Sequence, residues 1–282
     1  MLINLRADEL FERVSATLAA FFRECGRKSA VLGLSGGIDS AVVACIAVNA
    51  LGKDNVHGLI MPSPFSTLHS VSDAVELAVN LEIGYDIIPI ESILNRFSQE
   101  LEPVFKKGIE NITQENIQAR IRGVLLMAYS NQSGALVLNT SNKSELSVGY
   151  GTLYGDLAGA VMVLADIYKL DVYELARYIN SVKESIPDST MTKPPSAELS
   201  PGQKDSDQLP VYEILDPVLF ALNECGKSPS EIIGEADTAL VKKVIELKEK
   251  ASFKRFQLPQ MIQVGDHPLM PEKCVRLNPD AY

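Results

Sequence analysis

A Ser-Gly-Gly-Ile-Asp-Ser string that begins at Ser35 has residue types and spacing that could hold a pyrophosphate. Gly36 and Gly37 lack a Cβ, so phosphate oxygens could approach the backbone N–H groups, and Ser35 and Ser40 add hydroxyl donors. Asp39 would repel phosphates unless a divalent cation lay between them, which makes its carboxylate a candidate magnesium ligand. The same string also fits a tight turn without a ligand, so these residues alone predict an anion site and nothing narrower.

A second polar cluster, Asn-Thr-Ser-Asn-Lys-Ser-Glu, runs from residue 139 to residue 145. Thr140 could approach a nucleotide, and Glu145 could supply a second carboxylate, because an ion that bridges phosphates commonly takes one or two. The cluster also fits a turn followed by a helix cap. Lys169 lies just before a predicted helix, where a cation could reach a phosphate chain, although such a lysine is also typical of an exposed surface.

The elements that must position these side chains are strands that alternate with helices. Apolar runs predict strands at 30–34, 56–62, 85–90 and 135–138. Helical spacing predicts helices at 10–22, 41–51, 68–81 and 113–131. This alternation indicates an α/β fold, a Rossmann-like parallel sheet with helices on both faces. In such sheets ligands bind at the carboxyl ends of the strands, where Ser35 and Thr140 both fall.

The predicted helix at 113–131 carries two arginines. Its core stripe is expected to contain Ile117, Ile121, Val124, Leu125 and Ala128. Arg120 falls at the edge of this stripe, and Arg122 lies about 200° round the helix from Arg120. The two arginines therefore cannot serve one site from one helix face. Spacing alone favours a surface position for either side chain, with its stem along apolar surface.

The composition is that of a globular protein, with 282 residues, 46% hydrophobic and 22% charged. No apolar stretch approaches the roughly 20 residues that span a bilayer, and charged residues near the start leave no secretory segment, so we expect no membrane partner and a cytoplasmic location. The four cysteines and three histidines show neither redox nor metal-ligand spacing. A net charge of −10 without a basic run disfavours a nucleic-acid partner and favours small-molecule substrates.

Residues 187–210 differ from the rest of the chain, because they contain five prolines and almost no apolar residues. A segment of this kind inside a compact domain is typical of a disordered region or a mobile functional loop, such as a lid. We therefore expect one domain over residues 1–282, with a core at about 10–182, a mobile lid at about 187–210 and a small helical C-terminal part at about 211–282.

The motifs together resemble those of the NAD synthetase family, which belongs to the ATP pyrophosphatase superfamily. The resemblance covers residues 10 to 260 and rests on the strings at 35–40, 118–122, 140–145, 149–156, 168–169 and 193–199. It implies a two-step reaction, in which the carboxylate of deamido-NAD attacks the α-phosphate of ATP and ammonia then displaces AMP. Such chemistry requires a held pyrophosphate, neutralised charge and exclusion of water, but no strong protein nucleophile.

The resemblance also implies roles for individual residues. ATP would be bound by Gly33, Leu34, Ser35, Gly36, Gly37, Ile38, Asp39, Ser40, Thr140, Lys169 and Ser196. Deamido-NAD would contact Arg120 and Lys254, Mg²⁺ would be held by Asp39 and Glu145, and Asp39 and Lys169 would be the catalytic residues. Three positions depart from short bacterial synthetases, with Leu153 in place of lysine, Ala160 in place of aspartate and Phe253 in place of histidine. These departures make the chain more similar to the synthetase half of glutamine-using enzymes.

Only about 30 residues precede the glycine-containing string, too few for the amidase domain of glutamine-using relatives, so we expect free ammonia to be the nitrogen source. The resemblance further implies a homodimer. Two other functions stay open: another ATP pyrophosphatase, such as a tRNA-modifying enzyme, and a non-catalytic ATP-binding module. The acidic charge disfavours the first, and the presence of Asp39, Glu145 and Lys169 disfavours the second.

Overall fold

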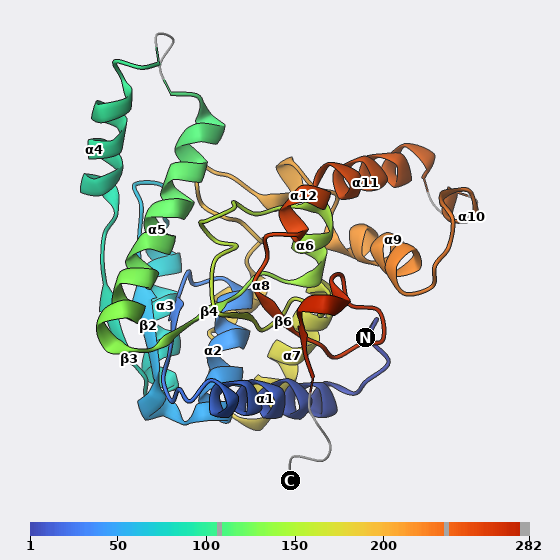
Figure 1. Ribbon diagram of the computed structural model, residues 1–282, viewed down its shortest axis with the longest axis horizontal. Coiled ribbons are helices and arrows are strands. Elements are labelled where there is room, and N and C mark those ends of the chain that lie inside the picture. The colour runs from blue at the N-terminus through green and yellow to red at the C-terminus, as the bar shows by residue number, and fades with distance from the viewer. Residues whose placement is uncertain (106–108, 234–236, 277–282) are drawn as a thin grey trace.

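A computed structural model describes residues 1–105, 109–233 and 237–276 (Figure 1). Its centre is a sheet of seven parallel strands in the order β3-β2-β1-β4-β5-β6-β7. The strands are β1 (Ala30–Gly33), β2 (Val56–Ile60), β3 (Gly84–Ile87), β4 (Leu136–Asn139), β5 (Val161–Met162), β6 (Gln260–Ile262) and β7 (Cys274–Val275). The chain order reverses between β1 and β4, and in a doubly wound sheet this is where a ligand crevice forms.

Helices cover both faces of the sheet (Figure 1). The helices are α1 (Ala7–Glu24), α2 (Ile38–Leu51), α3 (Leu68–Asn80), α4 (Glu91–Leu101), α5 (Asn111–Ser133), α6 (Lys143–Val148), α7 (Lys169–Val182), α8 (Asp188–Thr192), α9 (Tyr212–Asn223), α10 (Pro229–Ile233), α11 (Thr238–Lys250) and α12 (Ser252–Arg255). On one face α1, α2 and α7 pack against one another, and on the other α5 packs against β1 and β4. None of the helices in the described ranges is long and apolar enough to cross a membrane.

The alternation of side chains along β1 explains how the two layers share one strand. Leu32 belongs to the large apolar cluster that contains α1, α2 and α7, whereas its neighbour Val31 belongs to a smaller cluster with Ile117 and Ile121 of α5. Successive strand residues point to opposite faces, so a buried central strand needs apolar residues at every position. The near-continuous apolar runs in the sequence follow from this requirement.

The predicted α/β fold with a parallel sheet is confirmed, and the structure adds four details to it. The C-terminal part contains the expected helices and also the strands β6 and β7, which extend the sheet. Helix α2 begins at Ile38 instead of residue 41, so Asp39 lies in its first turn. On α5, Val124 is 66% exposed, so the core stripe is narrower than expected. Strand β3 is exposed, because it forms the edge of the sheet.

Candidate functional site

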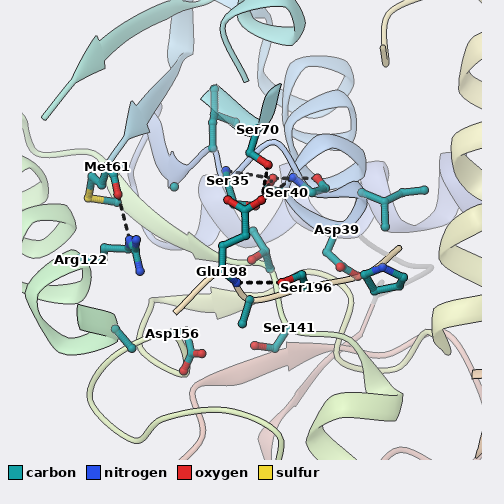
Figure 2. Close-up of a pocket in the computed structure, with 18 of the residues that line it drawn as sticks. Ser35, Asp39, Ser40, Met61, Ser70, Arg122, Ser141, Asp156, Ser196 and Glu198 are labelled. Carbon is teal, nitrogen blue, oxygen red and sulfur yellow. Dashed lines mark hydrogen bonds between the residues drawn. The ribbon is translucent and has the colours of Figure 1, made fainter. Parts of the chain in front are cut away.

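A cavity of about 290 Å³ opens at the carboxyl ends of β1, β2 and β4 (Figure 2). Helices α2, α3, α5, α6 and α7 and the proline-containing segment 187–210 contribute to its walls. Of the residues predicted to bind ATP or metal, the structure brings the following to this cavity: Gly33, Leu34, Ser35, Gly37, Ile38, Asp39, Ser40, Thr140, Glu145, Lys169 and Ser196. Residues that are more than 160 positions apart in the chain therefore line the same cavity.

The turn between β1 and α2 has the shape of an anion-binding loop. Gly36 has a φ of +77°, and a Cβ there would lie 2.2 Å from the carbonyl oxygen of Ser70 in α3, so only glycine fits. The Ser40 hydroxyl donates to the Gly37 carbonyl at 3.0 Å and lies 3.1 Å from the Ser35 hydroxyl. No side chain caps α2 at Gly37, so the N–H groups of its first turn can bind a phosphate.

Lys169 lies between two carboxylates beside this loop. Its Nζ donates to Asp39 Oδ2 at 2.5 Å and to Glu145 Oε1 at 3.4 Å. The lysine is the first residue of α7 and only 2% exposed, so its interpretation as an ordinary surface lysine is wrong. Burial lowers the pKa of Lys169, but Asp39 and Glu145 outweigh it and raise the pKa overall, which keeps the ammonium group charged.

Glu145 has two tasks in this arrangement. Its Oε2 accepts a hydrogen bond from the Asn142 N–H at 3.3 Å, and the Asn142 side chain accepts one from the Glu145 N–H at 3.0 Å, which together form a capping box at the start of α6. The expected helix cap is thus confirmed. The other oxygen, Oε1, remains for Lys169. The pKa of Glu145 is raised to about 8, mainly by burial; Lys169 opposes this shift, and the nearby carboxylic groups of Asp39 and Asp205 add to it.

Asp205 is a third carboxylate near the same lysine. It accepts hydrogen bonds from the Tyr150 hydroxyl at 3.1 Å and the Tyr212 hydroxyl at 2.9 Å, and burial raises its pKa. Three carboxylic groups, those of Asp39, Glu145 and Asp205, thus lie near one ammonium group, so acidic groups outnumber the basic one. Such an excess of buried acidic groups is unfavourable unless one of them holds a proton or a further cation binds.

This arrangement fits a magnesium ion. Asp39 and Glu145 offer the oxygen ligands that Mg²⁺ prefers, on the side of the cavity where acidic groups are in excess. Within the described residues no group of three or more metal-binding side chains is present, so most ligands of an ion would come from phosphate oxygens and water. That division is typical of magnesium bound together with a nucleotide.

Three predicted residues, Gly36, Arg120 and Lys254, lie outside the cavity lining. Arg120 is exposed, and its Nε donates to the Leu153 carbonyl at 3.2 Å. Lys254 donates to the carbonyls of Gly149 at 2.8 Å and Gly151 at 2.7 Å. The Arg120 and Lys254 side chains both hold the glycine- and tyrosine-containing loop at 149–156, and both ends of this loop reach the cavity. Their predicted contact with deamido-NAD stays a prediction.

The structure adds residues that sequence analysis did not assign to the site. These are Arg122, Asp156, Lys193, Glu198 and Asp205, all of which line the cavity. Arg122 is not a surface arginine as expected: its Nε donates to the Met61 carbonyl at 3.0 Å, at the end of β2 (Figure 2). The angular separation from Arg120 already indicated that the two side chains serve different places. Nothing in the sequence indicated which of the two faces the cavity.

The segment 187–210 is attached to the loop and to α3 at several points. Lys193 forms an ion pair with Asp73 of α3 at 2.9 Å. Glu198 Oε1 accepts hydrogen bonds from the Ser70 hydroxyl at 2.6 Å and the Thr67 hydroxyl at 3.1 Å. The Thr190 hydroxyl donates to the Gly36 carbonyl at 3.1 Å. The segment thus covers the cavity in this structure and contacts the loop itself.

Comparisons with known proteins place this geometry in context. The NAD synthase family model matches residues 10–259. A glutamine-dependent NAD(+) synthetase of Synechocystis sp. is 48% identical over 260 residues, which cover 92% of this chain and 47% of the relative. The chain spans about half the length of the curated relatives it matches.

Two solved structures are similar over their whole length. The NH3-dependent NAD synthetase of Campylobacter jejuni has a TM-score of 0.75 and 32% identity, covering 92% of this chain and 100% of that one. The NMN synthetase of Francisella tularensis has a TM-score of 0.78 and 28% identity, covering 93% of this chain and 100% of that one.

Proposed function

The chain belongs to the NAD synthase family, and from this membership and the cavity we propose that it catalyses the ATP-dependent amidation of deamido-NAD to NAD. The reaction would pass through an adenylated intermediate, use ammonia, and release AMP and pyrophosphate. The observation that carries the proposal is the convergence of Asp39, Glu145 and Lys169 on the glycine-containing loop in one cavity. A phosphate-binding loop, a pair of magnesium-type carboxylates and a lysine are the groups that cleavage of ATP at its α-phosphate needs.

In this proposal the chain binds and orients two substrates. Ser35, Ser40 and the amides at the start of α2 hold the β- and γ-phosphates, and Lys169 neutralises the charge that grows on the leaving pyrophosphate. Asp39 and Glu145 would hold the magnesium ion, which supplies electrostatic stabilisation of the phosphate oxygens. Thr140 and Ser196 contact the nucleotide from β4 and from the segment 187–210. Arg120 and Lys254 contact deamido-NAD.

The segment 187–210 acts as a lid in this mechanism. A mixed anhydride between a carboxylate and AMP hydrolyses readily, so water must be kept out until ammonia attacks. The contacts of Lys193, Glu198 and Thr190 with α3 and the loop support this role, because they couple the segment to the phosphate site.

Free ammonia is our proposed nitrogen source. The similarity to the NH3-dependent NAD synthetase of Campylobacter jejuni supports this assignment, whereas the curated relatives are named glutamine-dependent. Activity with ammonium chloride in the absence of any other protein would support the assignment. A homodimer stays a prediction from the resemblance, tested by the mass of the purified protein in solution.

The test is an assay with purified protein, Mg²⁺, ATP, deamido-NAD and ammonium, in which NAD and AMP are quantified together. Equal amounts of NAD and AMP are expected. AMP formation only in the presence of tRNA would favour a tRNA-modifying enzyme, and tight ATP binding without any turnover would favour a non-catalytic ATP-binding module. Either result would overturn the proposal.

A second candidate is amidation of the mononucleotide instead of the dinucleotide. The full-length match to the NMN synthetase of Francisella tularensis favours it. The same assay with nicotinate mononucleotide in place of deamido-NAD separates the two, since the ratio of the two kcat/KM values defines the substrate. A preference for the mononucleotide would replace the first proposal.

A further inference from the structure

Arg122 has an unusual position among the cations of the cavity. Of the three basic side chains that line it, Lys169 pairs with Asp39 and Lys193 pairs with Asp73. Arg122 forms no ion pair with any residue of the described ranges. Its one hydrogen bond is from Nε to the Met61 carbonyl at 3.0 Å, so the N–H groups on its two terminal nitrogens are unused.

The nearest acidic side chains are committed elsewhere. Glu198 is held by the Thr67 and Ser70 groups of α3, and Asp156 Oδ1 accepts a hydrogen bond from the Thr152 N–H at 2.5 Å. Both carboxylates act on Arg122 only through space, and both raise its pKa while burial lowers it to about 10. The guanidinium is therefore charged at neutral pH, partly buried, and without a carboxylate at bonding distance.

A partly buried cation with free donors in a cavity wall is well placed to bind a ligand that supplies the missing acceptors. The bond to Met61 fixes the plane of the guanidinium, and a planar fork of this kind binds carboxylate and phosphate groups through two parallel hydrogen bonds. In Figure 2 Arg122 and Asp39 lie on opposite sides of the cavity, so the arginine belongs to a different part of the site from the carboxylate–lysine cluster.

We propose that Arg122 binds an anionic oxygen group of a substrate, either the α-phosphate of ATP or the carboxylate of deamido-NAD, through the N–H groups that its bond to Met61 leaves free. This inference rests on the proposed function and adds a residue to it. Both candidate groups take part in the adenylation step, and each is an acceptor of the geometry that the guanidinium fits. Arg122 would then bring the reacting oxygens together from the side opposite Lys169.

The test uses Arg122→Gln, which retains hydrogen-bond donors without charge, and Arg122→Met, which has a similar length without either. Arg96→Gln on α4, which breaks an exposed ion pair with Glu100, is the matched control. For each protein, kcat and the KM values for ATP and deamido-NAD are measured at saturating ammonium. Binding of MgATP alone and of deamido-NAD alone is measured by calorimetry.

Both Arg122 variants are expected to raise one KM and the matching dissociation constant by about 10- to 100-fold, as removal of a charged hydrogen-bond partner predicts. An effect on ATP assigns the α-phosphate, and an effect on deamido-NAD assigns the carboxylate. Apolar replacement of a partly buried unpaired charge usually preserves folding, so Arg122→Met serves if the glutamine variant does not fold. A folded variant of either kind with both KM values within two-fold of the parent protein overturns the inference. Absence of NAD formation by the parent protein would instead overturn the proposed function.

Discussion

Two buried lysines, Lys143 and Lys169, look alike in sequence and burial but have different environments. Lys143 is 1% exposed, and its Nζ donates to Asp166 Oδ1 at 2.7 Å, Glu224 Oε1 at 2.5 Å and the His267 carbonyl at 2.9 Å. Three donors thus meet three acceptors. Lys169 has two carboxylates within 4 Å and a third nearby, and these carboxylates face the cavity.

The difference separates a structural ion cluster from a functional one. Around Lys143 the second oxygen of Asp166 is also occupied, by the N–H groups of Val264 at 2.9 Å and Gly265 at 2.7 Å, so the cluster joins α6 to the end of α9 and to the C-terminal segment. Around Lys169 the three carboxylic groups line the cavity, where a ligand can reach them. A buried ion cluster is therefore informative about function when its acidic groups face a cavity, and Lys143 and Glu145, two residues apart on α6, belong to one cluster of each kind.

The largest effect that would test this comparison is expected from Asp39→Asn. It removes one charge from the Lys169 cluster and weakens the proposed metal site, so kcat should fall on the order of 10³-fold. The free energy of unfolding should change little, because the asparagine still accepts a hydrogen bond from Lys169. Steady-state assays of NAD formation and urea titrations measure the two quantities. Asp54→Asn, on the exposed turn before β2, is the control, and undiminished activity of the Asp39 variant would remove Asp39 from the metal site.

The next largest effect distinguishes the two lysines directly. Lys143→Met leaves Asp166 buried without its cation, and we expect it to lower the free energy of unfolding by about 3–5 kcal/mol. Lys169→Met should cost less stability, because its carboxylates border the cavity and can reach solvent, but it should reduce kcat more strongly. Urea unfolding measures the loss of stability in both variants, and initial rates measure the loss of kcat. Equal losses of stability in the two variants would mean that access to the cavity does not distinguish the clusters.

The sequence predicted the parts of this site that local patterns determine. It did not predict the side-chain positions that depend on packing between different elements. The loop at Ser35–Ser40, the strand ends and the placement of Thr140 and Glu145 followed from glycine chemistry and parallel-sheet geometry, which act over a few residues. The positions of the Lys169 and Arg122 side chains in the cavity did not follow, because each depends on other elements of the fold: α2 and α6 for the lysine, and the end of β2 for the arginine. Likewise β6 and β7 are too short to stand out from the sequence, since they gain stability only from neighbouring strands.

The smallest effect is a dependence of stability on pH through Glu145. Burial raises its pKa to about 8, whereas the unfolded chain has the ordinary value near 4.5, so between these values the native state holds a proton that the unfolded state has lost. This contribution is complete below about pH 4.5 and is lost as pH rises towards 8. The free energy of unfolding without ligands should fall in that window, by at most about 1.4 kcal/mol per pH unit.

Glu145→Gln should flatten this profile, and Glu246→Gln on the exposed face of α11 should leave it as in the parent protein. Urea midpoints measured at intervals from pH 5 to 8 give the slope. Mg²⁺ with ATP should reverse the trend, because a bound dication favours the ionised carboxylate and its affinity must then rise with pH over the same range. If the parent protein and Glu145→Gln show the same profile, another group near Lys169 holds the proton instead of Glu145. The contrast between the Lys143 and Lys169 clusters would then rest only on their positions relative to the cavity.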